Sequence, residues 1–438
     1  MKTALVLGAG LVTRPLVHYL LDLADVQVIV ASRTVSKAEA LINGHPRGEA
    51  RSLNVEDANA LRTLIPTADL SISMLPYAYH AQVAELCIEF GKDMVTTSYV
   101  SPPMRALDER AKARGVTLLN EIGVDPGIDH MSAMKVIHHV QQNGGEITSF
   151  RSWVGGLPAP EANTNPFGYK FSWSPRGVLL AGRNAARYLE DGKEINIAGE
   201  ELFDHHWPVE ISGLDDLEGY PNRNALPYAD LYGIPTAKTV FRGTLRNPGW
   251  CATLKKMVEL GLLDLEDREW HASTFRQFLA QLIGYEGYDI RKATAAYLAL
   301  ETDSFVLDNL EWLGLFGEEP LPLEHGAPID ILTARMLEKM PYEAGERDML
   351  VMQHEFMAQY PDRQEEITAT MIDFGIPAGD SSMSRTVGLP AAIASRMVLQ
   401  GKLTRKGVLV PMTPDIYEPV LAELEQLGIR LEEKMRSI

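Results

Sequence analysis

The first 125 residues alternate between two patterns of hydrophobic and polar positions. Short unbroken apolar runs, such as residues 4–7 and 26–31, are typical of parallel strands that are covered on both faces. Each run is followed by a segment of helical periodicity, beginning with residues 14–21. This alternation predicts a doubly wound, Rossmann-type parallel sheet. Further strands are predicted at residues 50–53, 69–75, 93–97 and 116–120, and further helices at residues 57–65, 79–90, 103–114 and 128–142.

The pattern changes after residue 145. Residues 147–154 alternate between polar and apolar side chains, as expected for a strand of a half-exposed sheet, whereas residues 251–340 follow helical periodicity. We therefore predict a second α/β domain with a mixed sheet and a small all-helical insertion. Strands are predicted at residues 348–356 and 366–374, helices at residues 389–399 and 417–427, and loops at residues 155–161 and 242–246. Residues 407–411 and the last of these helices close the chain. The predicted domains are residues 1–125 with about 385–438 (Rossmann), 126–250 with about 341–384 (second α/β) and 251–340 (helical).

A glycine loop connects the first predicted strand to the first predicted helix. It contains Gly8 and Gly10, with Thr13 at the position where the common fingerprint has a third glycine. Such a loop directs free backbone N–H groups toward one point, where a pyrophosphate binds. The motif alone is weak evidence, but its position between a strand pattern and a helix pattern predicts a dinucleotide site.

The end of the second strand predicts which dinucleotide binds. NAD-selective folds place an acidic residue there to accept the ribose 2′-OH. This chain instead has Ser32, Arg33 and Thr34, which suit a 2′-phosphate. The alternative for Arg33 is a solvated turn residue. We predict NADP as the cofactor.

Composition and charge exclude several classes of function. The 438 residues are 45% hydrophobic and 23% charged, which is enough for a large core, and the net charge of −18 argues against a nucleic-acid partner. No apolar run reaches membrane-spanning length, and the N-terminus leaves no room for a signal peptide. Cys87 and Cys251 are far apart, so a reducing, cytoplasmic location is expected. The adjacent histidines at 138–139 and 205–206 cannot face one metal ion, and no metal site is expected.

Other polar residues offer chemistry at predicted loops. Asp125 has two compatible interpretations, as the N-cap of the helix at residues 128–142 or as a carboxylate at the edge of the cofactor cleft. Trp173 lies in an aromatic loop that could be a domain joint or could stack on a nicotinamide ring. Arg223 and Arg246 lie in predicted loops. Each could bind a carboxylate through two parallel hydrogen bonds, although such arginines are more often surface residues.

Several long motifs resemble those of one family. They are residues 8–15, 31–34, 95–102, 120–130, 155–161, 168–174, 220–223 and 242–246. Through these motifs the chain is similar to the saccharopine dehydrogenases, NADP-dependent enzymes of the L-glutamate-forming type. The resemblance implies a Rossmann domain, an α/β domain that binds saccharopine and forms a homodimer, and a small helical domain.

The resemblance also assigns roles by position. Its cofactor contacts fall on Gly8, Ala9, Gly10, Leu11, Val12, Ser32, Arg33, Thr34, Asn54, Val55, Leu75, Thr97, Ser98, Val124, Asp125 and Pro126. Its substrate contacts fall on Ser98, Tyr99, Asp125, Arg223, Thr244, Leu245 and Arg246. Residues 224–225 and 247–248 depart from the family's usual pairs beside these positions.

The implied reaction joins 2-aminoadipate 6-semialdehyde and glutamate as an imine, which NADPH reduces to saccharopine. Asp125, assisted by Tyr99, is the expected proton-transfer group at nitrogen. Two alternatives remain open from the sequence. One is a related enzyme that joins another aldehyde and amine, of the carboxypolyamine dehydrogenase type, and the other is a non-catalytic, NADP-binding regulatory protein.

Overall fold

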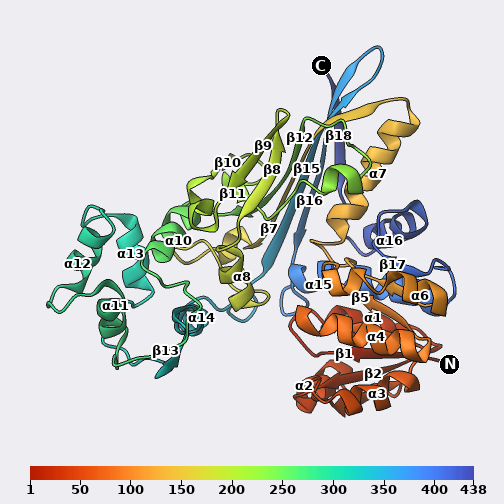
Figure 1. Cartoon of the computed structure of the whole chain (residues 1–438), viewed down its shortest axis with the longest axis horizontal. Coiled ribbons are helices and arrows are strands. Elements are labelled where there is room, and N and C mark those ends of the chain that lie inside the picture. Colours follow the sequence, from red (N-terminus) through yellow and green to blue (C-terminus); the bar gives the residue numbers. More distant parts are fainter. The chain divides into compact units, whose positions relative to one another are not determined.

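The computed structural model describes residues 1–438, except for the side chain of Ala58. The chain divides into two compact units (Figure 1). The first contains Met1–Glu146 and Ala369–Lys434, and the second contains Ile147–Thr368 and Met435–Ile438. The predicted helical domain at residues 251–340 falls within the second unit, and its independence stays a prediction.

The first unit confirms the predicted Rossmann-type sheet. Among the described residues it contains a seven-stranded sheet in the order β3-β2-β1-β4-β5-β6-β17, in which all neighbouring strands are parallel. The direction of strand order reverses between β1 and β4, which is where such sheets bind ligands. The strands are β1 (Lys2–Leu7), β2 (Val26–Ser32), β3 (Gly48–Ser52), β4 (Leu70–Ser73), β5 (Asp93–Thr96), β6 (Thr117–Leu119) and β17 (Gly407–Leu409).

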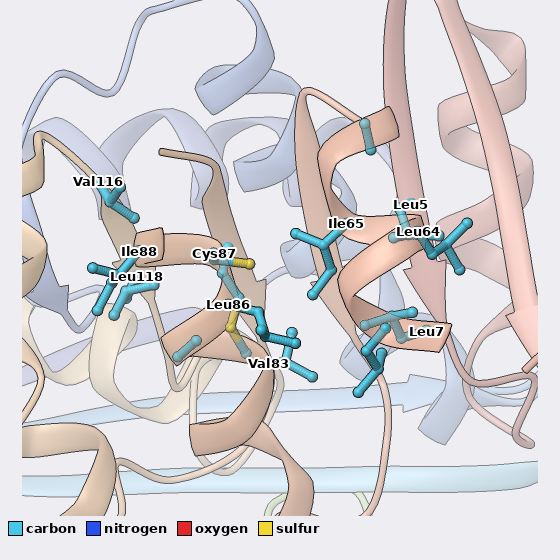
Figure 2. Close-up of a cluster of buried hydrophobic side chains, with 14 of the residues drawn as sticks. Leu5, Leu7, Leu64, Ile65, Val83, Leu86, Cys87, Ile88, Val116 and Leu118 are labelled. Atoms are coloured by element: carbon cyan, nitrogen blue, oxygen red, sulfur yellow. The ribbon is translucent and has the colours of Figure 1, made fainter. Parts of the chain in front are cut away.

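Helices pack against this sheet through apolar side chains. Figure 2 shows one buried cluster, in which Leu5 and Leu7 of β1 lie near Leu64 and other side chains contributed by helices. Burial raises the pKa of the Cys87 thiol in this cluster to about 12, so the thiol is not reactive. The helices are α1 (Arg14–Asp22), α2 (Val35–Ile42), α3 (Ala58–Leu64), α4 (His80–Phe90), α5 (Pro102–Arg105), α6 (Asp108–Arg114), α7 (Ile128–Gln142), α15 (Ser382–Leu399) and α16 (Pro414–Gln426).

Two predicted helices differ from those observed. The helix predicted at residues 103–114 is broken into α5 and α6. The helix predicted to begin at Leu389 begins instead at Ser382, where the side chain of Ser381 accepts a hydrogen bond from the Ser384 N–H. Pro390 therefore lies inside the helix. A Cβ atom on Gly388 would lie 3.0 Å from the Val12 carbonyl oxygen, so α15 approaches the start of α1 closely.

The second sheet is mixed, as predicted. Its order is β10-β11-β12-β7-β15-β16-β18, with β8 paired to β12 and β9. β12 is parallel to β7 and antiparallel to β11. The strands are β7 (Glu146–Pro158), β8 (Ala186–Glu190), β9 (Lys193–Ile197), β10 (Trp207–Val209), β11 (Leu217–Pro221), β12 (Thr239–Arg246), β15 (Asp348–Gln359), β16 (Gln364–Phe374) and β18 (Glu432–Ser437).

Two predicted loops in this unit were wrong. Residues 155–158 continue β7, because Gly155 allows close approach to its neighbour, and a Cβ atom there would lie 2.7 Å from the Leu245 carbonyl oxygen. Residues 242–246 belong to β12.

The remaining elements are α8 (Pro175–Ala181), α9 (Tyr228–Leu231), α10 (Trp250–Glu259), α11 (Phe275–Ile283), α12 (Ile290–Tyr297), α13 (Phe305–Trp312), α14 (Pro328–Lys339), β13 (Arg268–Glu269) and β14 (His325–Gly326). None of the helices in the described part of the chain combines membrane-spanning length with an apolar sequence.

Candidate active site

The glycine loop has the geometry that a pyrophosphate requires. Gly8 adopts φ +108°, and a Cβ atom there would lie 2.8 Å from the Met74 carbonyl oxygen, so only glycine fits between β1 and the end of β4. Thr13 is fully buried and its hydroxyl accepts a hydrogen bond of 3.2 Å from the Gly10 N–H, which explains a threonine at the third fingerprint position. Within the described residues, the N–H groups of Ala9, Leu11 and Val12 donate to no protein acceptor. These free donors fit a phosphate ligand.

The end of β2 suits a 2′-phosphate. The Arg33 side chain is exposed and makes no ion pair among the described residues. The Thr34 N–H donates to the Ser32 hydroxyl, and Thr34 is the N-cap of α2, whose first turn has no acidic residue. A phosphate would therefore meet a free guanidinium and a helix N-terminus without a competing carboxylate.

The other predicted residues of the first unit follow the carboxyl ends of its strands. This is the edge at which open α/β sheets bind ligands. Asn54 and Val55 follow β3, Leu75 follows β4, Thr97 and Ser98 follow β5, and Val124 and Pro126 lie in the segment between β6 and α7.

Tyr99 and Asp125 are brought together, as the catalytic prediction requires. The Tyr99 hydroxyl donates to Asp125 Oδ1 over 2.6 Å, and both side chains are half-buried. The N-cap interpretation of Asp125 was wrong. Gly127 is the N-cap of α7, and the carboxylate that accepts the Gly127 N–H is that of Asp129, at 2.6 Å. The Asp125 carboxylate instead accepts the hydrogen bond from the Tyr99 hydroxyl.

A buried cluster of Glu121, Asp129 and His130 supports this pair. Glu121 accepts the Val100 N–H on its side chain at 2.8 Å and donates its own N–H to the Ser98 carbonyl at 3.1 Å, so it holds the chain on both sides of Tyr99. Its second carboxylate oxygen lies 2.8 Å from His130 Nε2. These three residues were not predicted as site residues, although the density of polar groups after a buried strand was a signal that could have identified them.

In the second unit, Arg246 is a buried cation that forms no ion pair with a carboxylate in the described part of the chain. Its side chain is 5% exposed, and among the described residues it makes no ion pair. Its guanidinium carbon lies 5.0 Å from the ring centre of Tyr169 and 5.4 Å from that of Trp250, and Nη1 donates to the Leu245 carbonyl at 2.8 Å. Nε is buried without a hydrogen-bond acceptor in the described structure. A buried charge of this kind is costly unless an anion joins it.

Other residues predicted to bind cofactor or substrate lie near Arg246 within the second unit. Trp173, predicted to contact the cofactor, hydrogen-bonds the Tyr169 side chain. Burial raises the pKa of Tyr220 to about 12, so this phenol stays neutral beside Arg246. Thr244 and Leu245 precede Arg246 on β12, which fixes their spacing from it.

Arg223 differs from Arg246. Its side chain is exposed, its backbone adopts φ +54°, and its carbonyl accepts the Arg187 N–H at 2.9 Å. Its role in substrate binding stays a prediction.

Among the described residues, no group of three or more His, Cys, Asp or Glu side chains is arranged to hold a metal ion.

Comparisons with known proteins agree with this chemistry. Residues 4–119 match the model of the saccharopine dehydrogenase NADP binding domain, and residues 123–429 match that of the saccharopine dehydrogenase C-terminal domain. The chain is 41% identical to saccharopine dehydrogenase [NADP(+), L-glutamate-forming] from Schizosaccharomyces pombe, over 99% of both chains. It is 38% identical to mitochondrial alpha-aminoadipic semialdehyde synthase from Bos taurus, over 98% of this chain and 47% of that protein.

A solved structure supports the same assignment. The apo form of saccharopine dehydrogenase (L-Glu forming) from Saccharomyces cerevisiae aligns over 100% of both chains, with a TM-score of 0.91 and 40% sequence identity. The predicted fold class and the predicted NADP cofactor are therefore confirmed. The chain belongs to the saccharopine dehydrogenase family.

Proposed function

We propose that this chain interconverts L-saccharopine with 2-aminoadipate 6-semialdehyde and L-glutamate, using NADP. The observation that carries the proposal is the buried Arg246 guanidinium, which makes no ion pair among the described residues. Saccharopine has three carboxylates, and a site that removes them from water must supply fixed positive charge. In a chain of net charge −18 that charge has to come from particular residues.

The proposed mechanism assigns one task to each group. NADP, when bound at the glycine loop and the end of β2, would supply the hydride acceptor or donor. Arg246 holds a substrate carboxylate, and Arg223 is a second candidate for this task. The Asp125 carboxylate takes the proton from the secondary amine when saccharopine is oxidised and returns it in the opposite direction, while Tyr99 donates a hydrogen bond that orients the carboxylate. Water then adds to the imine and releases the aldehyde and glutamate.

A screen of aldehyde and amine pairs tests the substrate assignment. Each pair is incubated with NADPH, and loss of the reduced cofactor is followed by absorbance. We expect 2-aminoadipate 6-semialdehyde with glutamate to give the highest catalytic efficiency. A higher value for a pair with fewer carboxylates would favour the carboxypolyamine dehydrogenase type, and no turnover with any pair would favour a regulatory protein.

We expect Arg33→Ala to lower the preference for NADPH. A charge-assisted hydrogen bond contributes about 1.5–3 kcal/mol, so the KM for NADPH should rise roughly tenfold or more. The KM for NADH should hardly change, because NADH has no 2′-phosphate. Arg51→Ala, in which the lost arginine is already paired with Glu49 on β3, is the matched control. Equal losses for both cofactors in Arg33→Ala would contradict the assignment.

We also propose that the protein is a cytoplasmic homodimer that pairs through its second α/β domain. The family resemblance supports the dimer, and two buried free thiols, Cys87 and Cys251, fit a reducing compartment. Light scattering should give about twice the mass of the 48.5 kDa chain at working concentration. A single-chain mass at that concentration would contradict this prediction.

A further inference from the structure

A buried histidine that the sequence analysis did not single out contacts a predicted ligand-binding residue. His80, at the start of α4, is 3% exposed. Its Nδ1 lies 2.8 Å from the Ser73 hydroxyl, and its Nε2 lies 2.8 Å from the Ser98 hydroxyl. The three side chains therefore form a row that ends at Ser98, which is a predicted contact of both cofactor and substrate.

The hydrogen-bond donors around the ring determine where its proton lies. Ser73 is fully buried, and among the described residues its hydroxyl has no acceptor other than His80 Nδ1. Thr96 cannot supply a better donor to Nδ1, because its own hydroxyl donates to the Ser73 carbonyl at 2.9 Å and lies 3.5 Å from the ring. If Nδ1 carried the proton, the Ser73 O–H would be buried and unsatisfied. Nδ1 must therefore accept, and the proton resides on Nε2.

Burial also keeps the ring neutral. Removal from solvent lowers the pKa of His80 to about 4, so only one ring nitrogen carries a proton at neutral pH. Nε2 then donates to the Ser98 oxygen and occupies one of its acceptor positions. The Ser98 proton cannot point back to the ring and is free to be donated elsewhere.

We propose that His80 is a positioning residue that makes Ser98 a hydrogen-bond donor toward a ligand oxygen. This role of His80 adds a specific interaction to the proposed function, and it depends on that function for the identity of the substrate. The ligand oxygen belongs to a carbonyl or carboxylate, which the cofactor carboxamide and the substrate carboxylates both supply. Separate measurements with NADPH and with saccharopine distinguish these two sources.

The tautomer is tested directly by two-bond ¹H–¹⁵N spectra of histidine-labelled protein, with His80→Gln used to assign the signal. We expect the pattern of a neutral ring protonated at Nε2, both with and without NADPH. A ring protonated at Nδ1, or a charged ring at neutral pH, would overturn the proposal. This readout does not depend on turnover, so it remains informative if the proposed reaction is wrong.

Kinetics and binding test the effect on the ligand. His80→Leu removes the donor to Ser98, and either the NADPH dissociation constant or the KM for saccharopine should rise roughly five- to tenfold. His80→Gln keeps an N–H group at the position of Nε2 and should restore most of the loss. His18→Leu is the control and should change neither constant, because the one hydrogen bond of the His18 ring within the described residues is to the Leu41 carbonyl.

A double-mutant cycle separates this role from general structural support. In a Ser98→Ala background, His80→Leu should cause no further loss in the affected constant. An equal loss in that background would overturn the proposal.

If His80→Leu does not fold, Ser73→Ala replaces it. Without the Ser73 hydroxyl, Nδ1 of His80 no longer has to accept a hydrogen bond, so the ring proton is no longer confined to Nε2. Ser73→Ala should then raise the same constant as Ser98→Ala, by a smaller factor, and no change in Ser73→Ala would count against the proposal.

Discussion

Replacing Arg246 by methionine should lower kcat/KM for saccharopine by at least about 30-fold, because removing one partner of a buried charge pair typically costs about 2–5 kcal/mol. The free energy of unfolding should be unchanged or higher. The guanidinium is buried against Tyr169 and Trp250 and makes no ion pair within the described residues, so methionine removes a buried charge that lacks an ion-pair partner and keeps most of the volume. Activity would be measured with saccharopine and NADP, and stability by urea unfolding.

Arg335→Met is the matched control for this prediction. Arg335 is a buried arginine of the same unit, but it pairs with Glu319 and Glu338 and donates to the Leu313 carbonyl at 2.6 Å. Its loss should lower the free energy of unfolding and leave the KM for saccharopine unchanged. If Arg246→Met were instead strongly destabilised with a normal KM, Arg246 would be a structural residue and the substrate site would lie elsewhere.

Asp125→Asn should lower kcat by about 10²–10⁴-fold, the usual contribution of a positioned proton-transfer group. The amide has nearly the same shape and still accepts the Tyr99 hydroxyl, but it cannot take a proton from the amine. Tyr99→Phe should have a smaller effect, and the double variant should be little worse than Asp125→Asn alone, because the two groups act as a unit.

Tyr19→Phe provides the control for the tyrosine–carboxylate pair. Tyr19 on α1 donates to Glu423 on α16 over 2.5 Å in the same unit, and neither residue is a predicted ligand contact. Its loss should leave kcat unchanged. A normal pH–rate profile and normal kcat in Asp125→Asn would exclude the carboxylate as the proton-transfer group.

The first sheet could be predicted because its strands are buried on both faces and appear as unbroken apolar runs. The strands that were missed in the second sheet are different. β8 and β9 carry many polar residues, and their only clear signal was the turn at Asp191 and Gly192, where both residues adopt positive φ. β12 was misread because Arg242 and Arg246 suggested a loop, whereas the structure buries both arginines within the strand.

The candidate site was predictable where the chemistry is local. The glycine loop and the serine, arginine and threonine after β2 depend on neighbours in sequence. The contacts of Arg246 are not local, because Tyr169 lies far from it along the chain. The same is true of His80 and Ser98, which belong to different elements. Periodicity identifies elements, but it cannot show which side chains of distant elements meet.

The discontinuous first unit has a consequence for synthesis of the protein. Its sheet is complete only when β17 pairs with β6, and α15 reaches α1 only after the whole of Ile147–Thr368 has been translated. At about 5–20 residues per second, that intervening segment takes roughly 10–45 s to make. During this interval β6 is an edge strand with unpaired backbone groups, and the apolar surface beneath α15 is uncovered. We therefore expect the nascent chain to bind chaperones until its last sixty or so residues emerge, and ribosome profiling of bound chaperones should show their release only at that point.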